Sequence, residues 1–306
     1  MAESRAAIYG AIAANVAIAT TKFIVAGITG SSAMLSEGIH SAVDTGNGVL
    51  LLVGTKLSER PPSAEHPFGH GKELYFWSLI VAVLIFGIGG GVSFYEGIVH
   101  IRHPEPMTEV GWNLIVLGAA VLFEGISFLI ALRQFRRENT GRPFWQALRT
   151  SKDPTTYTVM AEDAAALLGL VVAFAGIGAS QVLHEPVWDG AASLVIGLIL
   201  AGVAVLLVRE ARGLLIGEGI RASTARDIRA LALAQPGVRT AGRPLSMYIG
   251  RDEALLTLEL GFAPGLPVEA VAASIEALAR EVRARYPTLK RISIQPAVAA
   301  GPDGGA

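Results

Sequence analysis

The sequence predicts an α-helical membrane protein in which six transmembrane helices are followed by a small cytoplasmic α+β domain with the ferredoxin-like order αββαβ. Of its 306 residues, 52% are hydrophobic and the mean hydropathy is +0.49, which is too apolar for a wholly soluble chain. Charge is also uneven, since 28 of the first 208 residues are charged, against 23 of the last 98. We therefore expect a transmembrane domain (1–212), a cytoplasmic domain (213–297) and a disordered tail (298–306).

The six expected spans fall into two groups. A bilayer core about 30 Å thick needs roughly 20 apolar residues per helix. Three windows meet this with no charged residue or nearly none: residues 74–95, 164–184 and 190–208. Three others are as long but contain ionisable side chains: residues 7–30, 33–57 and 111–133.

The basic residues predict the orientation. Eleven lie in or beside the second connection, the fourth connection and the end of the sixth span, and the odd connections contain only Arg102. By the positive-inside rule, both termini are then cytoplasmic and the protein is a multi-pass protein of the cell (inner) membrane. The eleven are Lys56, Arg60, Lys72, Arg133, Arg136, Arg137, Arg142, Arg149, Lys152, Arg209 and Arg212.

After Arg212 the pattern changes to short elements. Helices are expected at 222–234 and 267–286, and strands at 244–249, 254–262 and 290–295, because apolar residues alternate with polar ones in the strand segments. A three-stranded sheet covered on one face by the two helices would bury these apolar positions.

Composition excludes several classes of function. The chain has no cysteine, so thiol catalysis, disulfides and cysteine-ligated metal clusters are ruled out. It also has no long basic run, and nucleic acid is therefore not an expected partner.

His40 and Asp44 are the first candidate ligands for a metal ion. Their spacing of four places an imidazole and a carboxylate on one face of a helix, which suits Zn²⁺ and other divalent first-row ions. The alternative is a His and Asp that bond only to each other inside the bundle. From the span ends, His40 and Asp44 lie roughly 10 and 17 Å deep, and Asp163 reaches a similar depth from the opposite side.

These residues carry a resemblance to a known family. The segments GITGSSAMLSEGIHSAVDTGNGVLLLVG (27–54) and AEHPFGHGK (64–72) resemble the cation diffusion facilitators, which are divalent-metal/proton antiporters, and in particular their zinc-transporter-like branch. The resemblance covers essentially the whole chain. It implies a homodimer in which spans one, two, four and five hold the metal, with His40 and Asp44 as the span-two ligands.

Span five departs from the family pattern. The family has two ligands there, four residues apart. If Asp163 is the second, the first falls on Val159, which cannot bind a metal. Glu162 could replace it, cap the helix or carry protons. Asn15 and Asn47 could supply a carbonyl oxygen, or hydrogen-bond between helices.

Three further candidates remain open. Glu124 could be a ligand, a proton site or the ion-pair partner of Lys22, and the ion pair is the simpler interpretation. His66 and His70 match a second metal site of the family, although the Asp that joins them in some members corresponds to Ser63.

The expected function is export of a divalent cation, zinc, from the cytoplasm in exchange for protons, and the direction of transport is implied by the family resemblance. The metal is the transported substrate, no cofactor is expected, and the cytoplasmic domain is expected to dimerise without sensing metal. Manganese or iron is the alternative cargo, since oxygen donors dominate the site. A membrane-embedded metalloenzyme, a channel and a sensor are the rival classes, and no HExxH motif is present.

Overall fold

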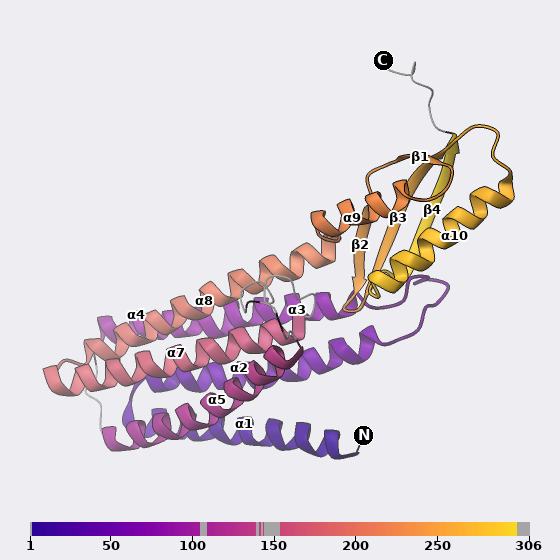
Figure 1. Cartoon of the computed structure of the whole chain (residues 1–306). Coiled ribbons are helices and arrows are strands. Elements are labelled where there is room, and N and C mark those ends of the chain that lie inside the picture. Colours follow the sequence, from indigo (N-terminus) through magenta and orange to yellow (C-terminus); the bar gives the residue numbers. More distant parts are fainter. Residues whose placement is uncertain (1, 105–108, 139–140, 142, 144–153, 299–306) are drawn as a thin grey trace. The chain divides into compact units, whose positions relative to one another are not determined.

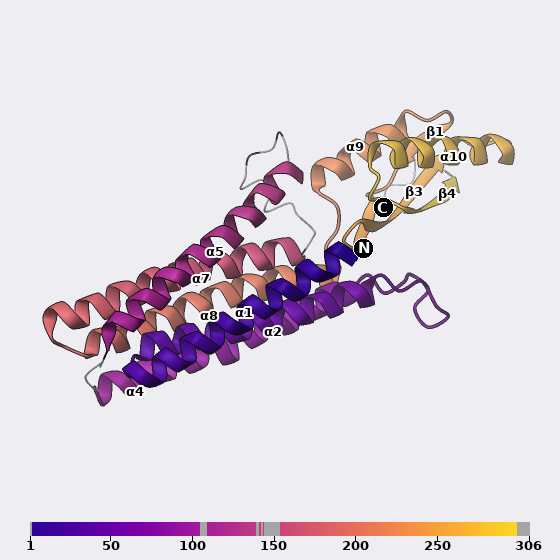
Figure 2. The ribbon, with the colours of Figure 1, turned by 90° about the horizontal axis from the view of Figure 1, so that it is seen from below.

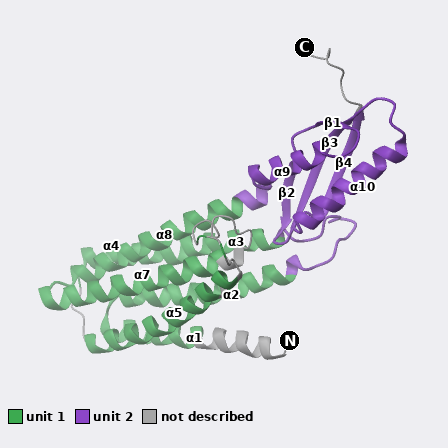
Figure 3. Cartoon of the chain, viewed as in Figure 1, with its two compact units in different colours: residues 1–56, 73–212 green, residues 57–72, 213–306 purple. Residues whose placement is uncertain are grey.

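The computed structural model describes residues 2–104, 109–138, 141, 143 and 154–298 (Figure 1). Arg142, Arg149, Lys152 and residues 299–306 of the expected tail lie outside this described part. The chain divides into two compact units (Figure 3). The helical unit contains residues 1–56 and 73–212, and the α+β unit contains residues 57–72 and 213–306, so the segment between the second and third long helices belongs with the C-terminal part.

The helical unit is a bundle of long helices that run side by side (Figures 1 and 2). One continuous helical run, 73–102, changes to a π-helix over Ile85–Gly90, a segment that contains Gly87, Gly89 and Gly90. The helices are α1 (Ala2–Thr29), α2 (Ser32–Ser58), α3 (Glu73–Leu84), η1 (Ile85–Gly90), α4 (Gly91–Arg102), α5 (Val110–Glu138), α7 (Pro154–Leu183) and α8 (Val187–Ile216).

Four helical runs in the described chain are long and apolar enough to cross a membrane: Glu73–Arg102, Val110–Arg137, Tyr157–Leu183 and Val187–Ile216. In the part of α1 whose side chains the structure describes, Asn15–Thr29 is an apolar helical stretch shorter than a full span, and α2 is interrupted by Glu37, His40 and Asp44. Six spans therefore remain a prediction for the first two helices.

Helices α4 and α8 pack unusually closely. A Cβ added at Gly97 would lie 2.7 Å from the backbone nitrogen of Leu194 and 2.8 Å from the carbonyl oxygen of Gly190, and one added at Gly197 would lie 2.8 Å from the backbone nitrogen of Phe94. The two backbones can approach this far only because glycine has no side chain.

The α+β unit has one more strand than the sequence predicted. Its elements are α9 (Ala222–Leu233), β1 (Val238–Ala241), β2 (Leu245–Gly250), β3 (Glu253–Phe262), α10 (Val268–Arg285) and β4 (Arg291–Val298). Strand β4 pairs in parallel along one edge of β3, while β2 and β1 pair antiparallel with successive parts of β3. The missed strand β1 is short and mixed in composition, and Pro244 follows it and cannot donate to a sheet ladder. Val298, expected in the tail, is the last residue of β4.

The alternation expected for β3 is confirmed. Leu256, Leu258 and Leu260 are buried in a core that includes Leu278 of α10 and Ile228 of α9. The remaining core residues of this unit come from the same strands and helices, as the two-layer arrangement requires.

Candidate metal centre

A cavity of about 390 Å³ lies within the helical unit and brings four carboxylates together. Asp44 comes from α2, Glu124 from α5, and Glu162 and Asp163 from α7. Four carboxylates around one cavity in a helical bundle repel one another and cost free energy unless a bound cation or protons compensate their charge. The other lining residues are Asn15, Ile18, Ser41, Gly48, Leu51, Phe123, Ile126, Ser127, Ile130 and Val159.

His40 and Asp44 face each other, as the spacing predicted. His40 Nε2 lies 3.3 Å from Asp44 Oδ2, and the His40 side chain is only 3% exposed. Neither Nε2 of His40 nor Oδ1 of Asp44 has a hydrogen bond in the described chain, although both atoms are buried. Buried polar atoms normally have a hydrogen-bond partner. These two atoms have none among the described residues, so their lone pairs are available to coordinate a metal ion.

Glu162 and Asp163 lie on the same helix but have different partners. Asn47 of α2 donates from Nδ2 to Oε1 of Glu162 at 2.9 Å, and Ser127 of α5 donates from Oγ to Oδ2 of Asp163 at 3.2 Å. Asn47 thus makes an interhelical hydrogen bond. Val159, at the position where the family has a ligand, also lines the cavity.

The ligand set is not assembled in this arrangement. Among the described residues, no three His, Asp or Glu side chains are close enough together to hold one metal ion. The assignment of His40, Asp44, Asp163 and Glu162 as metal ligands therefore stays a prediction.

Lys22 pairs with Glu37, and the expected pair with Glu124 is not formed. Lys22 Nζ lies 3.1 Å from Glu37 Oε2 and donates to Ser41 Oγ at 2.8 Å, and neither charged side chain is exposed. The second oxygen of Glu37 faces α7, where a Cβ at Gly169 would lie 2.5 Å from it. The sequence showed that Glu37 is an ionisable residue within the apolar segment 33–57, but it carried no signal that Glu37 would pair with Lys22.

His66 and His70 lie together in the segment 57–72 of the α+β unit, with ring centroids 4.5 Å apart. Ser63 Oγ accepts a hydrogen bond from the backbone nitrogen of His66, and the guanidinium of Arg291 lies 5.4 Å from the centre of the Phe68 ring. No third acid or histidine joins the pair in the described residues. The second metal site therefore stays a prediction.

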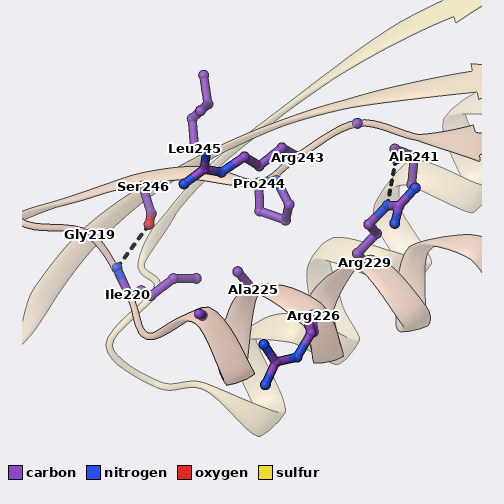
Figure 4. A pocket seen from close by; sticks show the side chains of 12 residues that line it. Gly219, Ile220, Ala225, Arg226, Arg229, Ala241, Arg243, Pro244, Leu245 and Ser246 are labelled. Atoms are coloured by element: carbon purple, nitrogen blue, oxygen red, sulfur yellow. Dashed lines mark hydrogen bonds between the residues drawn. The ribbon is translucent and has the colours of Figure 1, made fainter.

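A larger cavity, of about 720 Å³, lies in the α+β unit and is unsuited to a cation (Figure 4). Arg226, Arg229 and Arg243 line it, and no lining residue is acidic. Arg229 donates from Nε to the carbonyl oxygen of Ala241 at 2.9 Å. A divalent metal would be repelled by the three guanidinium groups, so the acidic cavity of the helical unit is the candidate centre.

Comparison with known proteins gives a consistent result. A family model described as the cation efflux transmembrane domain matches residues 8–216. The proton-coupled zinc antiporter SLC30A9, mitochondrial, of Xenopus laevis is 34% identical over 236 residues, which are 76% of this chain and 42% of that protein. Metal tolerance protein C4 of Arabidopsis thaliana is 33% identical over 219 residues, 71% of this chain and 48% of that protein.

A bacterial relative matches over more of its own length. Magnetosome protein MamM of Paramagnetospirillum magneticum is 30% identical over 249 residues, which are 79% of this chain and 72% of MamM. The chain spans less than half the length of the SLC30A9 and C4 proteins that it matches.

Proposed function

Because this chain belongs to the cation efflux family, the cation diffusion facilitators, we propose that it exports zinc from the cytoplasm in exchange for protons. It is a multi-pass membrane protein of a family of metal transporters. The proposal extends to its place in the cell (inner) membrane with both termini in the cytoplasm, to a homodimer, and to transport without enzymatic catalysis.

The cavity of four carboxylates beside the His40–Asp44 pair carries the proposal. A metal ion needs a neutral imidazole and ionised carboxylates, so its binding releases protons and protonation releases the metal. Carboxylates in a bilayer segment are expensive and normally mark an ion path. In the inward-open state zinc would displace protons from His40, Asp44 and Asp163, and in the outward-open state protons would expel it.

The nitrogen donor of His40 favours zinc, whereas the four carboxylates of the cavity favour harder ions such as Mn²⁺ or Fe²⁺. The relative from Xenopus laevis is named for zinc. Manganese or iron as the cargo is therefore the alternative outcome of a competition assay across Zn²⁺, Mn²⁺, Fe²⁺, Co²⁺ and Cd²⁺.

We propose that residues 1–212 carry out transport and that residues 213–297 form the dimer contact, as the sequence suggested. The two helices cover one face of the sheet, which leaves the opposite face for a second copy. Leu245 of β2 is 63% exposed and is one apolar side chain available for such a contact. Residues 57–72 group with the α+β unit, and a change in that segment should therefore affect it as well.

The test is flux into liposomes that contain the purified protein, with and without an imposed pH gradient. Zinc uptake that rises with the gradient is expected for an antiporter, and gradient-independent flow would indicate a channel. His40→Ala and Asp44→Ala should abolish uptake while the protein remains folded, because Asp44 lines the cavity and His40 is in contact with Asp44. Wild-type uptake by both variants would refute the assignment of the site.

A further inference from the structure

The N-terminal end of α2 is held by a carboxylate from α8. Asp189 is fully buried, and its two oxygens accept four hydrogen bonds from the start of α2. Ser31 Oγ donates to Oδ1 at 2.7 Å, and Ser32 donates to Oδ2 from its backbone nitrogen at 2.6 Å and from Oγ at 2.9 Å. The backbone nitrogen of Ala33 completes the set at 3.3 Å.

These bonds add to a local helix cap, in which Ser31 Oγ accepts a hydrogen bond from the backbone nitrogen of Met34 at 3.1 Å. The first backbone N–H groups of a helix have no partner within it, and a side chain near in sequence usually satisfies them. Here the backbone N–H groups of Ser32 and Ala33 are satisfied by Asp189, a residue 157 positions from Ser32, so this part of the cap also joins two helices. Bonds to an ionised carboxylate are about twice as strong as neutral ones, and the positive end of the α2 dipole adds to them.

His100 of α4 also faces Asp189. Its Nε2 lies 3.8 Å from Oδ2, which is longer than a hydrogen bond, and this nitrogen has no hydrogen bond in the described chain. Ser193, one turn further along α8, donates from Oγ to Ser32 Oγ at 2.9 Å and supports the same contact. The start of α2 is therefore the principal partner of this buried carboxylate.

The rest of α2 has a different environment. Helix α8 is close-packed against α4 through glycines, which leaves this pair little freedom to separate. Farther along α2, Asp44, Gly48 and Leu51 border the acidic cavity, where space exists for movement. The N-terminal end of α2 is thus hydrogen-bonded to the close-packed helices α4 and α8, whereas the middle of α2 borders the acidic cavity.

We propose that Asp189 is a positioning residue that acts as the pivot of α2 during transport. It holds the first turn of α2 on α8 while the segment that carries His40 and Asp44 swings to close the cavity around the metal and to open it again. Asp189 is not a ligand itself, because Ser32 and Asp44 are roughly 18 Å apart along the helix axis. This inference rests on the proposed transport function.

The test combines a conservative variant with a distance measurement. Asp189→Asn keeps the side-chain volume but places an amide N–H₂ group against the hydrogen-bond donors at the start of α2. The matched control is Glu185→Gln, because Glu185 is an exposed acid a few residues earlier. The chain has no cysteine, so Leu52→Cys on α2 and Leu206→Cys on α8 provide two unique and exposed label sites. Spin-label distances are then measured in lipid nanodiscs with and without zinc.

For the wild type and the control we expect well-defined label distances that change when zinc is added. For Asp189→Asn we expect a broad distribution and zinc turnover lowered at least about tenfold, as for loss of a hydrogen bond to a charged group. Its zinc affinity at equilibrium should stay within about twofold, since the donors of the cavity are intact. Ser32→Ala removes one donor only and should lower turnover less, which keeps the test usable if Asp189→Asn folds poorly.

Unchanged turnover and distances in Asp189→Asn would overturn the pivot. A loss of zinc affinity in proportion to turnover would also overturn it, because Asp189 would then act on the site or on folding. If the wild-type protein transports no zinc, the proposed function is wrong. The pivot is then judged by the label distances alone, and a sharp distribution in zinc-free Asp189→Asn would refute it.

Discussion

The Lys22–Glu37 pair allows a prediction whose size follows from the structure. Both side chains are fully buried and their charged atoms are 3.1 Å apart. At an effective dielectric constant of about 20, two unit charges at that distance attract by about 5 kcal/mol. Most of this offsets the cost of removing two charges from water, so the pair as a whole adds little to stability.

Removing one partner should therefore be far worse than removing both. Lys22→Met leaves Glu37 as an unpaired buried carboxylate, and we expect the free energy of unfolding to fall by about 3–5 kcal/mol. Glu37→Met should cost a similar amount, because the Lys22 ammonium would retain only Ser41 as a partner. The double variant, with two apolar side chains of similar length, should be near the wild type in stability.

The assay is unfolding in mixed micelles by titration with sodium dodecyl sulfate, followed by tryptophan fluorescence. Lys56→Met, an exposed lysine near the other end of α2, is the matched control and should change stability by no more than about 0.5 kcal/mol. If the double variant loses as much as the two single variants together, the two charges are not coupled and the reasoning is wrong. A single Lys22→Met variant as stable as the wild type would refute it as well.

Further predictions concern the site, the protons, the C-terminal domain and the helix packing. Asp163→Asn should abolish zinc uptake in liposomes and Glu162→Gln should reduce it less; the reverse order would make Glu162 the principal ligand of α7. Zinc affinity should fall as the pH drops through the range in which an imidazole titrates, near 6.5, and calorimetry in buffers of different ionisation enthalpy should detect proton release; a value of zero would exclude competition between protons and metal. Residues 213–306 expressed alone should form a dimer whose melting temperature does not respond to micromolar zinc, because residues 213–297 lack His and Cys; a zinc-dependent dimer, seen by mass measurement, would reveal a missed site. Gly97→Ala should destabilise the protein by about 1–3 kcal/mol in the same micelle titration, since its Cβ would meet backbone atoms of α8, and Gly87→Ala, with no atom within 4 Å, should not.

The fold class could be predicted because its signals are local. Apolar runs long enough for a bilayer, alternating leucines in β3 and proline at the helix ends each depend on a few neighbouring residues. For the same reason the spacing of His40 and Asp44 predicted that both side chains share one helix face, and in the structure they lie 3.3 Å apart. Strand β1 was missed because four residues of mixed composition carry no such periodic signal.

The sequence by itself determined which residues are charged within the apolar part, and so which ones need a partner. Only the tertiary structure decided the partners: Lys22 bonds Glu37 instead of Glu124, and Asp189 caps a helix that begins 157 residues earlier. A single sequence has no periodicity that links positions so far apart, and every buried acid is an equally suitable partner for a lysine until the helices are packed. Close packing selects one of them, because it fixes which side chains can reach each other within hydrogen-bonding distance.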